Sequence, residues 1–109
     1  DDIRPLLQVT EIREIAADEL WLSGAFGTDA VGIHFTWLPE QDAVDALLPR
    51  LEERLLPLGA RPHWGKRFHA DAEALVPLYP RLDDFRALAR RHDPRGVFVN
   101  DFLRAKLAI

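Results

Sequence analysis

Two short segments, IHFTW at 33–37 and HWGK at 63–66, place polar side chains among aromatic ones. His34 and Thr36 alternate with apolar residues in the first segment, and Lys66 ends the second. A histidine can exchange a proton near neutral pH, a hydroxyl can donate and accept hydrogen bonds, and an ammonium group can stabilise a developing negative charge. Polar groups set between apolar walls are typical of a pocket that binds a small polar molecule.

The segment EIR adds a carboxylate at Glu11 and a guanidinium at Arg13. Apolar and polar residues alternate along 7–15 and again along 30–38, which is the period of a β-strand. If these strands are antiparallel neighbours, one face of the sheet collects several polar groups, and a nearby Lys66 would join them. We therefore take five residues as candidate site residues: Glu11, Arg13, His34, Thr36 and Lys66.

Each of these residues also has an ordinary structural interpretation. A half-exposed antiparallel sheet carries polar side chains on its wet side, and Glu11 with Arg13 could be a surface ion pair that contributes little to stability. A metal site is disfavoured, because His34, His63 and His69 have no carboxylate at a diagnostic spacing.

The elements that must position these side chains follow from periodicity. Strands are predicted at 7–15, 19–22, 30–38 and 61–65, and helices at 41–56 and 81–91. Apolar residues at i, i+3, i+4 and i+7 indicate the helices, and Pro49 should kink the first of them. The fold class is α+β, an antiparallel sheet with helices packed on one face. If the helices cover Ile33, Phe35 and Trp37, the polar face points away from them.

Length and charge limit the functions that the chain can have. Its 109 residues allow one domain with a modest core. Acidic residues outnumber basic ones by 18 to 14 and the basic ones are scattered, which argues against a nucleic-acid partner. The absence of cysteine excludes disulfides and thiolate metal sites. No apolar run reaches the ~20 residues of a membrane span and no secretory segment is seen, so we expect a cytoplasmic protein with no membrane partner.

Four segments together carry a family resemblance: VTEIREIAADELWLS, VGIHFTW, LGARPHWGK and LYPRLDDFRALARRHDPRGVFVNDFL. Over almost its whole length the chain resembles the C-terminal part of the alditol oxidase (xylitol oxidase) family. This family belongs to the FAD-linked sugar oxidases of the vanillyl-alcohol oxidase type and is related to the aldonolactone oxidases. Within it, IHFTW favours the alditol branch.

The resemblance implies that residues 1–109 are a C-terminal fragment of a larger flavoprotein. The chain has no methionine and begins with Asp1, and it contains none of the family's FAD fingerprint. The missing N-terminal domain would bind FAD, covalently through a histidine. The present chain would be part of the substrate-binding cap domain plus the C-terminal tail.

The resemblance also implies a role for each candidate residue against the flavin. Arg13 and Lys66 would hold hydroxyls and stabilise the alkoxide or the anionic reduced flavin. Glu11 and Thr36 would orient the substrate, and His34 is a candidate proton acceptor. The implied reaction oxidises the terminal hydroxyl of a small polyol such as xylitol or sorbitol, passes a hydride to FAD and reduces O2 to hydrogen peroxide.

Two other functions stay open at this point. A sugar-lactone oxidase of the D-arabinono-1,4-lactone type, or a related dehydrogenase, would use the same frame with another pocket or electron acceptor. A stand-alone binding or dimerisation domain is the second alternative.

We expect the isolated chain to be inactive and to self-associate through an apolar surface left by the FAD domain, with Trp64, Phe98, Phe102 and Leu103 as candidates. Lys106, the only other lysine, is expected to be an ordinary surface residue.

Overall fold

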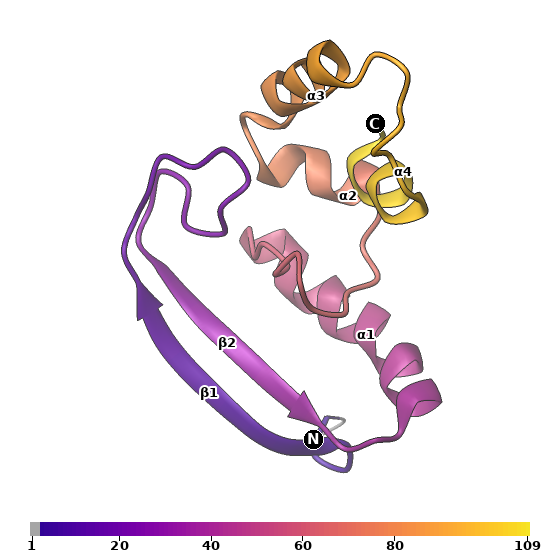
Figure 1. The fold of residues 1–109 in the computed structure, drawn as a ribbon. Helices are drawn as coiled ribbons and strands as arrows, with labels where there is room; N and C mark the ends of the chain where they lie inside the picture. Colours follow the sequence, from indigo (N-terminus) through magenta and orange to yellow (C-terminus); the bar gives the residue numbers. More distant parts are fainter. Residues whose placement is uncertain (1–2) are drawn as a thin grey trace.

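A long β-hairpin lies beside a group of helices in the computed structural model, which describes residues 3–109 (Figure 1). The strands β1 (Leu7–Ile15) and β2 (Ala30–Trp37) pair antiparallel. The helices are α1 (Gln41–Leu55), α2 (Ala72–Leu75), α3 (Leu82–His92) and α4 (Asp101–Leu107), with short 3-10 turns at Leu56–Leu58 and Val76–Leu78. The α+β class predicted from the sequence is confirmed.

The hairpin register follows from the alternation along both strands. Glu11 pairs with His34 and Arg13 pairs with Gly32, so these residues share one face of the sheet. An irregularity near Leu7 shifts the register by one residue at the open end of the hairpin. There the backbone N–H of Leu38 donates to the carbonyl of Leu6 at 2.8 Å, which holds the two strands together.

The prediction of four strands is wrong, because residues 3–109 form a sheet of β1 and β2 alone. At 19–22 the carboxylate of Asp18 accepts hydrogen bonds from the backbone N–H of Leu20 and the hydroxyl of Ser23. At 61–65 the imidazole of His63 accepts from the N–H of Gly65. These local side-chain bonds stabilise turns in place of strand pairing.

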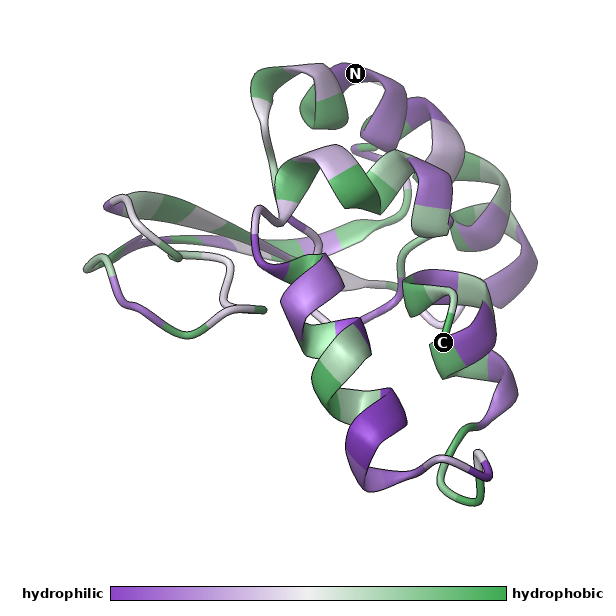
Figure 2. Ribbon diagram, turned by 90° about the horizontal axis from the view of Figure 1, so that it is seen from above, coloured by the Kyte–Doolittle hydropathy of each residue, from purple (hydrophilic) through white to green (hydrophobic). Residues whose placement is uncertain are grey.

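The helices lie to one side of the hairpin without covering it (Figures 1 and 2). On the face that we expected the helices to cover, Ile12 is 71% exposed, Val31 64% and Ile33 49%. The expectation that the helices pack over this face is therefore wrong. Both faces of the hairpin are largely open over most of its length.

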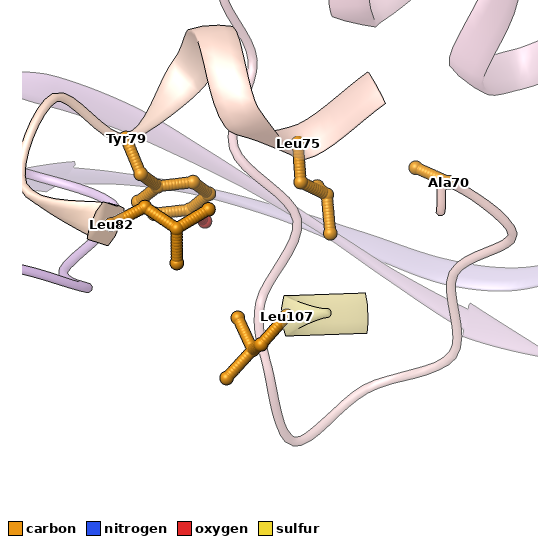
Figure 3. Packing of buried hydrophobic residues seen from close by; sticks show 5 residues of the cluster. All are labelled: Ala70, Leu75, Tyr79, Leu82 and Leu107. Atoms are coloured by element: carbon orange, nitrogen blue, oxygen red, sulfur yellow. The ribbon is translucent and has the colours of Figure 1, made fainter. Parts of the chain in front are cut away.

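The compact core belongs to the C-terminal half of the chain (Figure 3). Its buried members are Ala70, Leu75, Tyr79, Leu82 and Leu107. Leu107 comes from α4, so the apolar tail docks on the core of its own chain. Trp64 and Leu103 are partly buried against this cluster, which corrects the expectation that they are exposed.

The predicted helices agree with the structure to within one residue at each end. α1 runs through Pro49 and buries Val44, Leu47 and Leu48, and α3 buries Leu82. The two shorter helices were not predicted. Their N-caps are Asp71 and Asn100, whose side chains accept hydrogen bonds from the N–H groups of Ala74 and Leu103. Within residues 3–109, no helix combines the length and the apolar character that crossing a membrane requires.

Candidate functional site

One face of the hairpin carries Glu11, Arg13, His34 and Thr36, as the sequence predicts. Glu11 and His34 are directly opposite each other, Arg13 follows Glu11 by two residues on β1, and Thr36 follows His34 by two on β2. Successive side chains of a strand alternate between faces, so a two-residue spacing keeps each pair on the same side. We call these four residues the polar row.

Glu11 is the centre of the polar row. Its Oε2 accepts a hydrogen bond from the guanidinium of Arg13 at 2.6 Å. Nδ1 of His34 lies 3.6 Å from the same oxygen, close enough for electrostatic attraction but longer than a hydrogen bond. The hydroxyl of Thr10, on the opposite face, donates to the carbonyl of His34 at 2.8 Å and fixes the backbone there.

The ion pairs of the polar row contribute little to folding. The side chains of Arg13, Glu11 and His34 are 70%, 46% and 40% exposed, and surface pairs of this kind contribute about 0–1 kcal/mol. Replacing their mutual contacts by contacts to a polar ligand therefore costs little. Nδ1 of His34 lies on the Glu11 side of the ring.

Apolar residues border the polar row at both ends. Val9 pairs with Thr36 at one end, and Ile15 pairs with Ala30 at the other. Ile15 also covers Gly32, where an added β-carbon would lie 3.0 Å from its Cδ1. The row thus offers hydrogen-bonding groups in the middle and apolar side chains at the ends, with Val9 50% and Ile15 45% exposed.

Lys66 lies outside the polar row. Its backbone N–H donates to the carbonyl of His63 at 2.9 Å, which closes the turn of the HWGK segment. Its ammonium makes no hydrogen bond or ion pair within the part of the chain that the structure describes. Lys66 borders an open hollow of about 500 Å³ between α1 and α4, lined by Asp45, Leu48, Lys66, Arg67, Phe68, His69, Phe102 and Lys106.

Lys106 is not the ordinary surface lysine that the sequence suggests. Its Nζ donates to the carbonyls of Phe68, His69 and Ala70 at 3.4, 2.9 and 2.7 Å. It also lies 4.7 Å from the centre of the Phe68 ring, a cation–π distance. Lys106 therefore fastens α4 to the segment that follows HWGK.

Sequence reasoning missed the residues that join the hairpin to the core. Arg61 and Trp64 bind backbone carbonyls of the loop between β1 and β2. Arg61 also faces the ring of Tyr79, whose hydroxyl donates to the carbonyl of Pro62 at 3.3 Å. Burial raises the pKa of Tyr79 to about 12, and the nearby Arg61 cation opposes this rise. No sequence motif signals such contacts, because their acceptors are main-chain atoms.

Comparison with known proteins identifies the family. The family model for D-arabinono-1,4-lactone oxidase matches residues 8–106, which is nearly the whole chain. The chain belongs to the D-arabinono-1,4-lactone oxidase family.

Two curated relatives of this family member are informative. It is 52% identical over 104 residues to alditol oxidase of Streptomyces sp. (strain IKD472 / FERM P-14339), covering 95% of this chain and 25% of that protein. It is 35% identical over 103 residues to L-gulono-1,4-lactone dehydrogenase of Mycobacterium tuberculosis, covering 94% of this chain and 24% of that protein. The chain therefore spans about a quarter of the length of these relatives. The resemblance to the alditol oxidase and aldonolactone oxidase group is confirmed.

The helix N-termini of this lactone oxidase family member do not fit the pyrophosphate of FAD. Phosphate groups bind where helix N–H groups are free and the local charge is positive. The first turns of α1 to α4 instead carry acidic residues, Asp42, Glu73, Asp83, Asp84 and Asp101. Asp71 and Asn100 already accept from first-turn N–H groups of α2 and α4. The N-termini of α1 to α4 therefore do not favour binding of the pyrophosphate.

The three histidines weighed as metal ligands are engaged separately. His34 faces Glu11, Nδ1 of His63 accepts from the N–H of Gly65 at 3.0 Å, and His69 borders the hollow at α4. Across residues 3–109, no three His, Asp or Glu side chains are grouped so that they could hold a metal ion.

Proposed function

We propose that this chain forms the substrate side of the active site of an FAD-linked oxidase acting on alditols. The polar row carries this proposal, because it places a carboxylate, a guanidinium, an imidazole and a hydroxyl on one face. The 52% identity to an alditol oxidase supports the choice of substrate. The reaction would convert the terminal hydroxyl of xylitol or sorbitol to the aldehyde, with O2 reduced to hydrogen peroxide.

A linear polyol presents a series of hydroxyls, each of which both donates and accepts hydrogen bonds. Glu11 can accept from one hydroxyl, Arg13 can donate to its neighbour, and Thr36 can do either. The apolar side chains of Val9 and Ile15 would contact the carbon chain of the polyol at the two ends of the row. A site built to bond hydroxyls discriminates strongly against molecules that lack them, because its polar groups are then left without partners.

Proton removal is assigned to His34. Its imidazole has the Glu11 carboxylate 3.6 Å from Nδ1, and this carboxylate stabilises the imidazolium that forms when Nε2 takes the hydroxyl proton. Arg13 and Lys66 would stabilise the alkoxide as its charge develops. FAD, when bound, supplies the acceptor for the hydride that leaves the carbon.

We further propose that residues 1–109 are part of the substrate-binding cap domain plus the C-terminal tail, and that FAD is held mainly by another domain of the same polypeptide. The acidic first turns of α1 to α4 support this division, since they disfavour phosphate. The partners of this chain are then that domain, a small polyol and O2.

A sugar-lactone oxidase or dehydrogenase is the second candidate function. The family model is described as D-arabinono-1,4-lactone oxidase, and a lactone dehydrogenase is 35% identical over 94% of the chain. A lactone has fewer free hydroxyls than an alditol of the same carbon number, so it would leave more of the polar row without partners.

Steady-state assays of the full-length protein test the proposal. Oxygen consumption with xylitol and sorbitol should exceed that with D-arabinono-1,4-lactone or L-gulono-1,4-lactone, and hydrogen peroxide should accumulate with the polyols. Preference for a lactone, or activity only with an artificial electron acceptor, would contradict the alditol oxidase assignment. The 109-residue chain alone should be colourless and inactive even with added FAD. Tight yellow-coloured binding would overturn the division of roles.

A further inference from the structure

The hairpin that carries the polar row is attached to the rest of the molecule at its two ends. At its open end, β2 continues into α1. Between the ends its apolar side chains are exposed, as Ile12 and Ile33 illustrate. The position of the polar row therefore depends on how the closed end, residues 16–29, is held.

Arg61 binds the closed end with one nitrogen and the helical part with another. Its NH1 donates to the carbonyls of Ser23, Gly24 and Phe26 at 3.3, 3.4 and 3.1 Å. Its Nε donates to the carbonyl of Leu78 at 2.8 Å, next to the buried Tyr79. One guanidinium thus joins the loop between β1 and β2 to the core.

Trp64 makes a second attachment in the same place. Its indole Nε1 donates to the carbonyl of Leu22 at 2.7 Å, while its ring contacts Phe68 and Tyr79. Arg61 and Trp64 belong to the segment ARPHWGK, which ends at Lys66. Arg81 also lies over the ring of Trp21 in the same loop, at 4.7 Å. Trp64 and Arg61 are the attachments near the lysine assigned to the site, two and five positions before it.

We propose that Arg61, assisted by Trp64, is a positioning residue that holds the polar row in a fixed relation to Lys66. This inference rests on the proposed function, because it explains how a lysine outside the hairpin could act together with residues on it. Arg61 itself would not contact the substrate.

The geometry requires arginine. Its planar guanidinium presents donors along separate edges, so it can bind Leu78 and the loop carbonyls at once. A lysine has a single ammonium group at the end of a flexible stem and cannot reproduce this arrangement. Arg61→Lys keeps the charge and removes the fixed bridge, which makes it the test substitution.

Distance measurements on the 109-residue chain test the bridge without reference to activity. The chain has no cysteine, so Glu14→Cys on β1 and Arg90→Cys on α3 allow a single pair of spin labels. The labelled chain is diluted with unlabelled chain so that only the two labels within one molecule are measured. Double electron–electron resonance should then give one narrow distance between positions 14 and 90 in the parent, and a broad distribution of distances in Arg61→Lys. Arg86→Lys is the matched control, because Arg86 also bonds a backbone carbonyl, that of Leu107, but lies on α3 away from the hairpin.

An unchanged narrow distance in Arg61→Lys, or a broad one in the parent, would overturn the proposal. Should Arg61→Lys fail to fold, Trp64→Phe replaces it. Trp64→Phe removes the indole donor to Leu22, keeps a smaller aromatic ring against Phe68 and Tyr79, and must also broaden the distance if the bridge exists.

Kinetics of the full-length protein test whether the bridge serves the site. Arg61→Lys should lower kcat by roughly 10-fold to 10²-fold with little change in KM, as expected for misplaced groups. Combined with Lys66→Met, the loss should be smaller than the product of the single losses, because both substitutions disable the same arrangement. In the double variant of Arg86→Lys and Lys66→Met, the fold-loss in kcat should equal the product of the two single losses. If the losses in kcat for Arg61→Lys and Lys66→Met multiply in the double variant, the positioning role is refuted. If the parent protein does not oxidise polyols, the proposed function is refuted, but the distance measurement still tests the bridge.

Discussion

Glu11 and His34 face each other across the β1–β2 ladder, with Nδ1 of His34 3.6 Å from Oε2 of Glu11. The same oxygen accepts from Arg13 at 2.6 Å. One carboxylate therefore influences both the proposed proton acceptor and the proposed alkoxide-binding cation. Any change at Glu11 should affect proton removal and substrate orientation together.

Glu11→Gln in the full-length protein tests this relationship. The amide keeps the size of the side chain but removes the charge that favours the imidazolium of His34. We expect kcat/KM for xylitol to fall roughly 10²-fold, the lower end of a general-base contribution. Glu14→Gln, on the opposite face of the same strand, is the control and should retain parental kinetics. Equal rates for both variants would remove Glu11 from the site.

Lys66→Met tests the HWGK segment. It keeps the length and apolar stem of the side chain, so folding and FAD content should survive. Loss of one preorganised charge should lower kcat/KM by about 10²–10³-fold. Lys106 cannot serve as the control, because its ammonium bonds three carbonyls. Arg91→Met, at an exposed position in the last turn of α3, is the better comparison. Parental activity in Lys66→Met would show that the lysine has no role.

Lys106→Met should instead destabilise the fold. It leaves carbonyls of the 68–70 segment without their donor and loosens α4, at a cost of about 1–3 kcal/mol. Thermal or urea unfolding of the 109-residue chain measures this. On the same helix, Arg104 forms an ion pair with the exposed Asp101, so Arg104→Met should cost less than about 1 kcal/mol. The interpretation of Lys106 fails if the two variants unfold alike.

The stability of the chain should fall at high pH because of Tyr79. Its pKa is about 12 in the folded protein and 10.0 in the unfolded reference, so the folded state holds the proton more tightly. The stabilisation is complete below pH 10 and is lost as the pH rises towards 12, by at most about 3 kcal/mol. Tyr79 is the only tyrosine, so tyrosinate absorbance reports its titration directly. Tyr79→Phe should show less loss of stability between pH 10 and 12, and equal losses would contradict burial as the cause.

The 109-residue chain should self-associate through the turn before α4 and the start of that helix. Phe98 is 81% exposed, Val97 64% and Phe102 41%. Exposed apolar side chains that lie near one another favour association. Sedimentation should show a concentration-dependent shift that Phe98→Ser reduces. Leu58→Ser, at an equally exposed position after α1, is the control. A strictly monomeric parent would argue against this surface as an interface.

The sequence predicts those helices and strands whose hydrophobic periodicity lies within the segment itself. The apolar stripe of α1 and the alternation along β1 and β2 gave the helix, the strands and the shared face of the polar row. The strand predicted at 61–65 does not form, because His63 and Gly65 bond within a local turn and Arg61 and Trp64 bond to backbone atoms about 40 residues away. No local pattern encodes the long-range bonds. The helices α2 and α4 are too short for an apolar periodicity to reveal them. Their N-cap residues, Asp71 and Asn100, are the sequence signal that could have predicted where they begin.

The bare α-carbon of Gly32 lies on the same face as Arg13, opposite it in the ladder. A β-carbon there would lie 3.0 Å from Cδ1 of Ile15, so alanine would require the Ile15 side chain to shift. Under the proposed function, the space beside Arg13 that a ligand could occupy thus depends on Gly32, which has no side chain of its own. Variation at position 32 should alter which molecules fit, even though every hydrogen-bonding group stays the same.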